Sequence, residues 1–156
     1  MKAGDVIRWN NFPDPRYPQP PGKARWFICL GKIIEYQIDS SISSSVVVYI
    51  QTTTTQIQHY QPGESRGGLP YILFKAGEFG FEETCVLDFS MDIFSYQESD
   101  INKNASNIEI KGTLDKKKLI NIYNEVNGSM RISKKAKKII HDSLNMIGIT
   151  GLKQPR

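Results

Sequence analysis

The chain has 156 residues, a formal net charge of +4 at pH 7 and a sequence pI of about 9.0. This length fits a single domain with its own core, and the mild basic balance suits a polyanionic partner without requiring one. No apolar run approaches the roughly 20 residues needed to span a bilayer, and the first residues lack a signal-peptide pattern. We therefore expect a cytosolic protein, not a membrane or secreted one.

The two cysteines, Cys29 and Cys85, lie in apolar, strand-like runs. A thiol in such a run behaves as a small hydrophobic group. Two cysteines without a second pair do not form a zinc site. We therefore expect buried, reduced thiols, and neither a metal nor a cofactor.

A proline-rich loop separates two apolar strand patterns near the start of the chain. The strands are predicted at residues 6–9 and 25–35, and five of the eight prolines fall between Pro13 and Pro21. Because proline fixes φ and lacks a backbone N–H, this loop must be exposed and stiff. It delivers Arg25 to the beginning of the second strand, and loops held by a scaffold often carry function.

The middle of the chain consists of short strand patterns between turn signals. Residues 46–50 form a β-branched run that continues through the threonines at 52–55. Further strands are predicted at residues 71–74, 84–89, 93–96 and 108–110, with turns, loops or breaks at 40–45, 58–68, 77–80 and 102–107. Six or seven short strands without βαβ alternation predict a small β-barrel over residues 1–111.

The last third changes to helical spacing. A first helix is predicted with Thr113 as N-cap, Asp115 in its first turn and Gly128 as C-cap. The apolar residues with helical spacing in it are Leu119, Ile122, Tyr123 and Val126. Residues 112–156 thus form a helical C-terminal portion, and the whole chain is mainly β with C-terminal helices in one domain.

A second amphipathic helix is predicted over residues 133–147, ended by Gly148. Its inward residues are predicted to be Ala136, Ile139, Ile140, Leu144 and Ile147, and its outer ones Lys134, Lys135, Lys137, Lys138 and His141. Two interpretations of the lysines stay open. They form either a solvated surface or a patch that binds the RNA backbone.

The order of several segments resembles that of MazF/PemK-like toxins. These segments are Gly-Asp-Val-Ile at 4–7, the loop that ends in Lys-Ala-Arg at 23–25, the strand at 26–30, Thr-Thr-Thr-Gln-Ile at 53–57, the segment at 83–88, and Gly-Thr-Leu at 112–114 before an amphipathic helix. The resemblance covers residues 1 to about 126, so the helix at 133–147 is an addition. It implies an SH3-like β-barrel with appended helices, generally dimeric. Many members are metal-independent endoribonucleases that cleave single-stranded RNA and are silenced by an antitoxin.

The resemblance also implies a set of site residues. Arg25 matches the arginine that closes the first loop, although the proline that usually follows it is here Trp26. Thr54 matches the threonine after the central strand, with Thr53 and Thr55 as neighbouring alternatives, and Asp88 matches the acid that ends a later strand. Some members carry an arginine two residues before this acid, where this chain has Val86.

Cleavage of RNA by its own 2′-hydroxyl requires a base, a cation for the phosphate oxygens and an acid for the leaving 5′-oxygen. Arg25 presents a charged fork that fits phosphate, so we expect it to stabilise charge. Asp88 is then the candidate base, Thr54 the group that orients the phosphate, and His59 a candidate for the unassigned acid. We expect the contacts with RNA to come from Arg16, Lys23, Gln56 and His59.

Each of these residues also has a purely structural interpretation. Arg25 pairs with a surface carboxylate, Thr54 serves β propensity, Asp88 caps a turn, and His59 is solvated. The aromatic residues Trp9, Tyr17, Trp26 and Tyr60 stack on bases, or else belong to the core or a dimer interface. Val86 and the missing acid motivate a second hypothesis, a non-enzymatic SH3-like barrel that binds nucleic acid or a protein partner. A toxin of this fold that acts on a protein target is a third.

Overall fold

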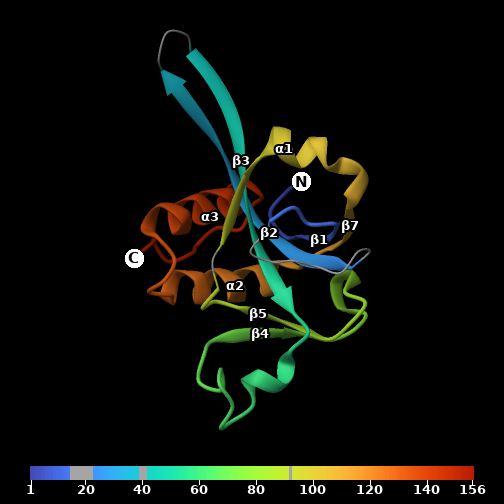
Figure 1. The fold of residues 1–156 in the computed structure, drawn as a ribbon. Helices are drawn as coiled ribbons and strands as arrows, with labels where there is room; N and C mark the ends of the chain where they lie inside the picture. The colour runs from blue at the N-terminus through green and yellow to red at the C-terminus, as the bar shows by residue number, and fades with distance from the viewer. Residues whose placement is uncertain (15–22, 39–41, 92) are drawn as a thin grey trace.

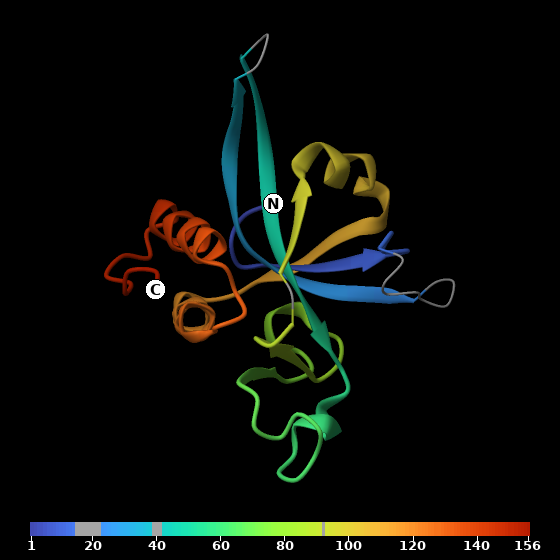
Figure 2. The same cartoon turned by 60° about the vertical axis from the view of Figure 1, so that its left-hand side comes forward.

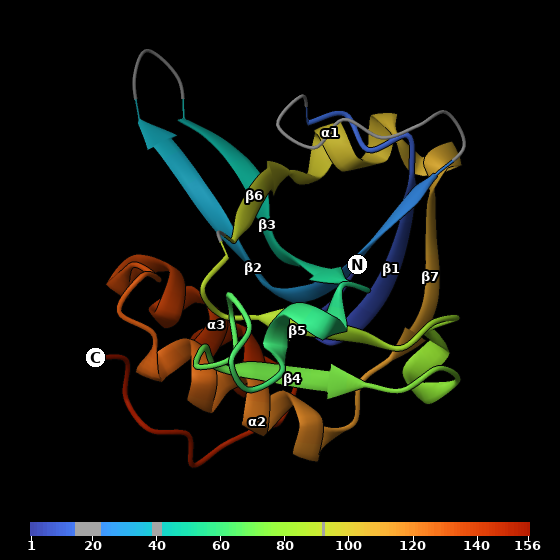
Figure 3. The same cartoon turned by 60° about the horizontal axis from the view of Figure 1, so that its bottom comes forward.

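A curled, antiparallel sheet dominates the computed structural model, which describes residues 1–14, 23–38, 42–91 and 93–156 (Figure 3). Within these ranges the sheet has seven strands, in the order β4-β5-β3-β2-β1-β7, with β6 paired to β3. They are β1 (Asp5–Asn10), β2 (Ala24–Ile38), β3 (Ile42–Thr54), β4 (Tyr71–Phe74), β5 (Cys85–Asp88), β6 (Phe94–Gln97) and β7 (Ile108–Thr113). The mainly β chain with C-terminal helices predicted from the sequence is confirmed, and the sheet curls into a half-barrel.

The helices are α1 (Glu98–Lys103), α2 (Lys116–Gly128) and α3 (Lys134–Met146), with short 3-10 turns η1 (Ile57–Tyr60), η2 (Glu78–Gly80) and η3 (Ala105–Asn107). Residues 102–107 interrupt the strands as predicted, but the helix α1 and the turn η3 that occupy this segment were not predicted. Only Ile101 of α1 is buried, so the segment has no apolar periodicity that a sequence pattern could detect. No helix in the described part of the chain is long and apolar enough to cross a membrane.

Strands β2 and β3 form a long hairpin that projects from the body (Figures 1 and 2). Their pairing runs from Phe27 opposite Thr52 to Ile38 opposite Ile42. The serines at 43–45, predicted to lie in a turn, therefore belong to β3, and this prediction is wrong. Serine is a weak strand former, but here the backbone of these residues is held in register by pairing with Glu35, Tyr36 and Gln37 of β2.

The curled sheet separates two hydrophobic clusters. Residues 27–30 of β2 alternate between them, because successive side chains of a strand point to opposite faces. Ile28 and Leu30 pack in the cluster that α2 and α3 cover, whereas Phe27 and Cys29 pack with Trp9 on the other face. This second cluster also contains Phe12, Phe94 and Ile101 of α1. Trp9 is thus a core residue, which was one of the structural alternatives to stacking on a base.

Helix α2 covers one face of the sheet with the apolar residues that the sequence predicts. Leu119, Ile122, Tyr123 and Val126 are all buried. The predicted caps are wrong by one or two residues. Asp115 is the N-cap, because its side chain accepts a hydrogen bond of 2.7 Å from the backbone N–H of Lys118, whereas Thr113 ends β7. Gly128 is the last helical residue and Ser129 is the C-cap.

Helix α3 begins after Ser133, whose hydroxyl caps it by accepting from the N–H of Ala136. Ala136, Ile139, Ile140 and Leu144 are buried as predicted, but Ile147 is 44% exposed. The outward placement of Lys137 and His141 is also wrong, since both are buried. The Lys137 Nζ donates to the backbone carbonyls of Asn127 and Arg156. Because α2 and the last residues of the chain both pack against α3, more of its circumference is covered than an amphipathic pattern indicates.

Helix α3 contacts β2 at Gly31, next to the bulge in that strand. The Ser143 hydroxyl donates to the Lys32 carbonyl at 2.9 Å and accepts from its N–H at 3.0 Å. A Cβ on Gly31 would lie 2.7 Å from the Ser143 Cβ. We therefore expect Gly31→Ala to lower the free energy of unfolding by about 1–3 kcal/mol, measured by urea denaturation.

Gly128→Ala is the matched control for this prediction. A Cβ on Gly128 meets nothing within 4 Å, and the residue lies in α2, where alanine is the better helix former. We expect this variant to be at least as stable as the wild type. An unfolding midpoint of Gly31→Ala equal to that of the wild type would contradict the close contact of α3 with β2.

Candidate functional site

A cavity of about 470 Å³ lies where the beginning of β2 and the end of β3 meet β5. It is lined by cationic, hydroxyl, carboxylate and aromatic side chains. These come from Lys23, Arg25, Trp26, Thr52, Thr53, Thr54, Thr55, Gln56, Arg66, Phe81, Glu83, Cys85, Asp88 and Met91. The cavity is therefore built from parts of the chain that are far apart in sequence.

Strand pairing explains why these segments meet. The end of β3 pairs with β2 on one side, where Phe27 lies opposite Thr52, and with β5 on the other, where Thr54 lies opposite Val86. Residues at the end of β3 consequently lie between Arg25 and Asp88. The sequence-predicted site residues Lys23, Arg25, Thr54, Gln56 and Asp88 all line this one cavity.

Two other predicted contact residues are placed differently. His59 is half-buried in η1 and does not line the cavity, although its carbonyl accepts a hydrogen bond of 2.9 Å from the N–H of Arg66. Arg16 and the aromatic residue Tyr17 lie outside the described residues.

Arg25 is half-buried at the beginning of β2, and its guanidinium donates to the Thr52 hydroxyl at 3.3 Å. The Thr54 hydroxyl accepts from the backbone N–H of Gln56 at 3.2 Å, which shapes the turn after β3. Trp26 follows Arg25 and packs against Phe81, with ring centroids 5.6 Å apart. A guanidinium, several hydroxyls and an indole therefore share one surface.

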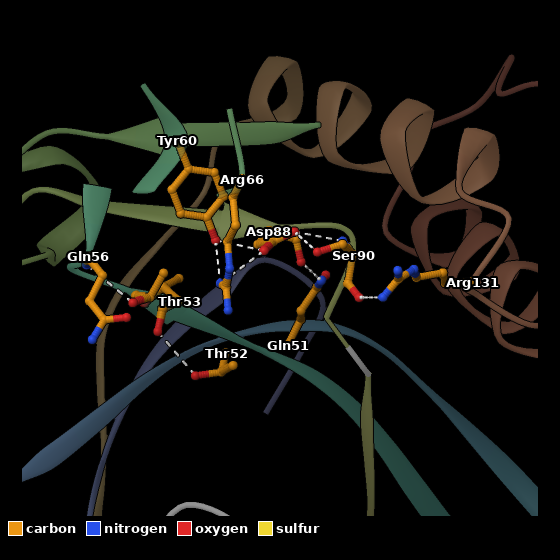
Figure 4. A network of polar contacts seen from close by, with 10 residues as sticks. Gln51, Thr52, Thr53, Gln56, Tyr60, Arg66, Asp88, Ser90 and Arg131 are labelled. Atoms are coloured by element: carbon orange, nitrogen blue, oxygen red, sulfur yellow. Dashed lines mark hydrogen bonds and ion pairs between the residues drawn. The ribbon is translucent and has the colours of Figure 1, made fainter. Parts of the chain in front are cut away.

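Asp88 is 1% exposed, and both of its carboxylate oxygens accept hydrogen bonds (Figure 4). The Tyr60 hydroxyl donates to Oδ2 at 2.7 Å, and Arg66 donates to the same oxygen at 3.3 Å. The backbone N–H and the hydroxyl of Ser90 donate to Oδ1 at 2.7 and 2.6 Å. The bonds to Ser90 agree with the interpretation of Asp88 as the residue that caps the turn after its strand.

Sequence reasoning missed Arg66, which lies in the polar, glycine-rich loop between β3 and β4. Its side chain is 35% exposed and is held by the Asp88 carboxylate and by the Tyr60 hydroxyl, the latter at 2.9 Å. The hydrogen bond with Tyr60 raises the pKa of Arg66. Burial, followed by the hydrogen bond to Asp88, raises the pKa of Tyr60 to about 12, so Tyr60 remains a donor at neutral pH.

The arginine that contacts the Asp88 carboxylate does not come from a neighbouring position in the sequence. The position two residues before Asp88 is Val86, which is buried. The guanidinium next to the Asp88 carboxylate instead comes from a residue that is 22 positions earlier in the chain. A run of Gln, Gly and Ser without periodicity gives no signal of such a contact.

No protein-family model, no curated protein and no solved structure matches this chain.

The remaining chemistry of the cavity is limited. Burial raises the pKa of the Cys85 thiol to about 11, which keeps it protonated and unreactive at neutral pH. Among the described residues, no group of three or more His, Cys, Asp and Glu side chains is placed to hold a metal ion. The cavity offers positive charge and hydrogen-bond donors beside an aromatic face. This combination suits the phosphate and the nucleobase of a nucleotide.

Proposed function

We propose that this protein is a MazF/PemK-like endoribonuclease with an SH3-like barrel, which cleaves single-stranded RNA in the cavity without a metal ion. The observation that carries the proposal is the presence of Lys23, Arg25 and Arg66 on one cavity beside a row of threonines. These residues are drawn from three separate segments of the chain, so their convergence comes from the fold.

The charge of the cavity supports an anionic substrate. Three cationic side chains face two carboxylates, those of Asp88 and Glu83. Among the described residues that line the cavity, cationic side chains therefore outnumber carboxylates by one, and the Arg66 guanidinium is already oriented by Asp88. A guanidinium fits two phosphate oxygens at once, which makes Arg25 and Arg66 suitable to stabilise charge as the phosphodiester reacts.

The aromatic face supports a single strand as the substrate. Trp26 lines the cavity beside the cations, and a base stacked on an aromatic ring gains about 1–3 kcal/mol. A base is free to stack in this way only when it is not held in a duplex. The site thus combines the two contacts that proteins use for single strands, namely a cation for the backbone and a ring for the base.

Cleavage of an unstructured RNA in the presence of EDTA tests the proposal. We expect fragments that end in a 2′,3′-cyclic phosphate and a 5′-hydroxyl, because the 2′-oxygen is the attacking group. RNA of the same sequence with 2′-O-methyl groups is the control, and should bind without being cleaved. RNA that stays intact with the protein in molar excess would contradict the nuclease proposal.

The same proposal makes the protein the toxin of a toxin-antitoxin pair. Its partners would be single-stranded RNA, an antitoxin protein that blocks the cavity, and a second copy of the chain in a homodimer. Light scattering tests the assembly, since a dimer has twice the 17.7 kDa mass of the chain.

One observation favours a second function, an SH3-like barrel that binds RNA or another partner without cleaving it. Asp88, the candidate base, has both carboxylate oxygens engaged by hydrogen bonds. A non-enzymatic binder would bind the unmodified and the 2′-O-methyl RNA equally well and leave both intact. The cleavage assay with EDTA therefore separates the two functions.

A further inference from the structure

The cavity holds two carboxylates in contrasting surroundings. Asp88 is buried and accepts four hydrogen bonds. Glu83 lines the same cavity just before β5 and is exposed. Within the described part of the chain, the Glu83 carboxylate makes no hydrogen bond and no ion pair. The two carboxylates are therefore suited to different chemical roles.

A general base must offer a lone pair to the proton that it removes. The lone pairs of Asp88 are directed to Tyr60, Arg66 and Ser90, so an approaching hydroxyl would have to displace one of these donors. The Glu83 carboxylate has no such donors to displace. Glu83 also lines the cavity that contains Arg25, the cation expected to hold the phosphate.

We propose that Glu83, and not Asp88, is the general base of the RNA cleavage assigned above, an inference that rests on that proposed function. The Glu83 carboxylate takes the proton of the 2′-hydroxyl as the 2′-oxygen forms a bond to phosphorus. The bond from phosphorus to the 5′-oxygen breaks, and this oxygen leaves with the electron pair and takes a proton from water. The proton on Glu83 then returns to solvent, and the products are a 2′,3′-cyclic phosphate and a 5′-hydroxyl.

Asp88 is in this scheme a positioning residue. Its carboxylate binds the Arg66 guanidinium from inside the protein, and the Tyr60 hydroxyl contacts both groups. Arg66 is thereby held at the cavity wall, where it adds a second guanidinium to that of Arg25. Two carboxylates in different surroundings thus have different roles, as occurs in other enzymes with paired acids.

The test compares Glu83→Gln with Glu82→Gln. Glu82 is the neighbouring residue, but it pairs with Lys111 at 3.1 Å and does not line the cavity. We expect Glu83→Gln to lower kcat by about 10²-fold or more, and Glu82→Gln to leave it unchanged.

Binding of the 2′-O-methyl RNA separates a lost base from a lost contact. We expect Glu83→Gln to bind this RNA as tightly as the wild type, or more tightly, because a negative charge near the phosphate is removed. Glu83→Gln activity within about threefold of the wild type, or a loss of binding as large as the loss of kcat, overturns the assignment of Glu83. A wild-type protein that does not cleave RNA overturns the proposed function itself, and this inference with it.

Discussion

An Arg25→Ala variant is expected to lower the rate of the proposed RNA cleavage about 10²–10³-fold relative to the wild type. This is the range found when one hydrogen-bond donor to a developing anion is removed. The guanidinium of Arg25 lies at the cavity and donates to the Thr52 hydroxyl at 3.3 Å, so its position is set by the end of β3. Charge increases on the phosphate oxygens as the 2′-oxygen attacks. Loss of the guanidinium therefore raises the energy of the transition state more than that of bound RNA.

Single-turnover cleavage with excess protein measures this effect. Arg25→Lys keeps the charge but not the fork, and we expect an intermediate rate from it. Arg8→Ala is the matched control, because Arg8 pairs with Glu109 on the surface at 3.1 Å and does not line the cavity. Equal rates for Arg25→Ala and Arg8→Ala, with both variants folded by circular dichroism, would contradict a role of Arg25 in the reaction.

Replacement of Asp88 by alanine is expected to lower the free energy of unfolding by about 1–3 kcal/mol, the cost of leaving a buried hydrogen-bonding group without its partner. The carboxylate is 1% exposed and accepts four hydrogen bonds. Its removal leaves the Tyr60 hydroxyl without this acceptor in a buried position, and an unsatisfied buried group is costly. It also leaves a gap between β5 and the loop that carries Arg66.

Urea denaturation of the two proteins gives this difference in free energy. Asp100→Ala is the control, since Asp100 forms a surface ion pair of 2.7 Å with Lys103 at 51% side-chain exposure. Exposed pairs of this kind contribute about 0–1 kcal/mol. Asp88→Asn keeps the shape of the side chain and should fall between the two. A loss below about 1 kcal/mol for Asp88→Ala would show that the cluster around it does not hold the loop.

Patterns of neighbouring residues predict most of the strands and the two long helices. The alternation of residues 27–30 indicates a strand with two apolar faces, and the spacing from Leu119 to Val126 indicates the buried face of α2, as the structure confirms. Such patterns succeed because strand and helix geometry place residues at fixed local intervals. They fail for α1, where a single buried residue, Ile101, gives no interval to detect.

The site is predicted less completely than the fold. Motif order singles out Arg25, Thr54 and Asp88, which do line one cavity. Arg66 and Glu83 escape notice as individual site residues, because their importance depends on which distant groups they face. Lys137 and His141 show the same limit, since each is polar, sits on a helix and is covered by segments that a helical pattern does not include.

By itself, the sequence determined three features: the alternating strands, the amphipathic helices, and the types of side chain near the proline-rich loop. All three follow from residues within a few positions of each other. Only the tertiary structure decided that β3 lies between β2 and β5, and hence that Asp88 is engaged by Tyr60, Arg66 and Ser90 while Glu83 is not. The physical reason is that burial and hydrogen bonding of a polar side chain depend on partners brought close by folding, and their distance along the chain leaves no local pattern.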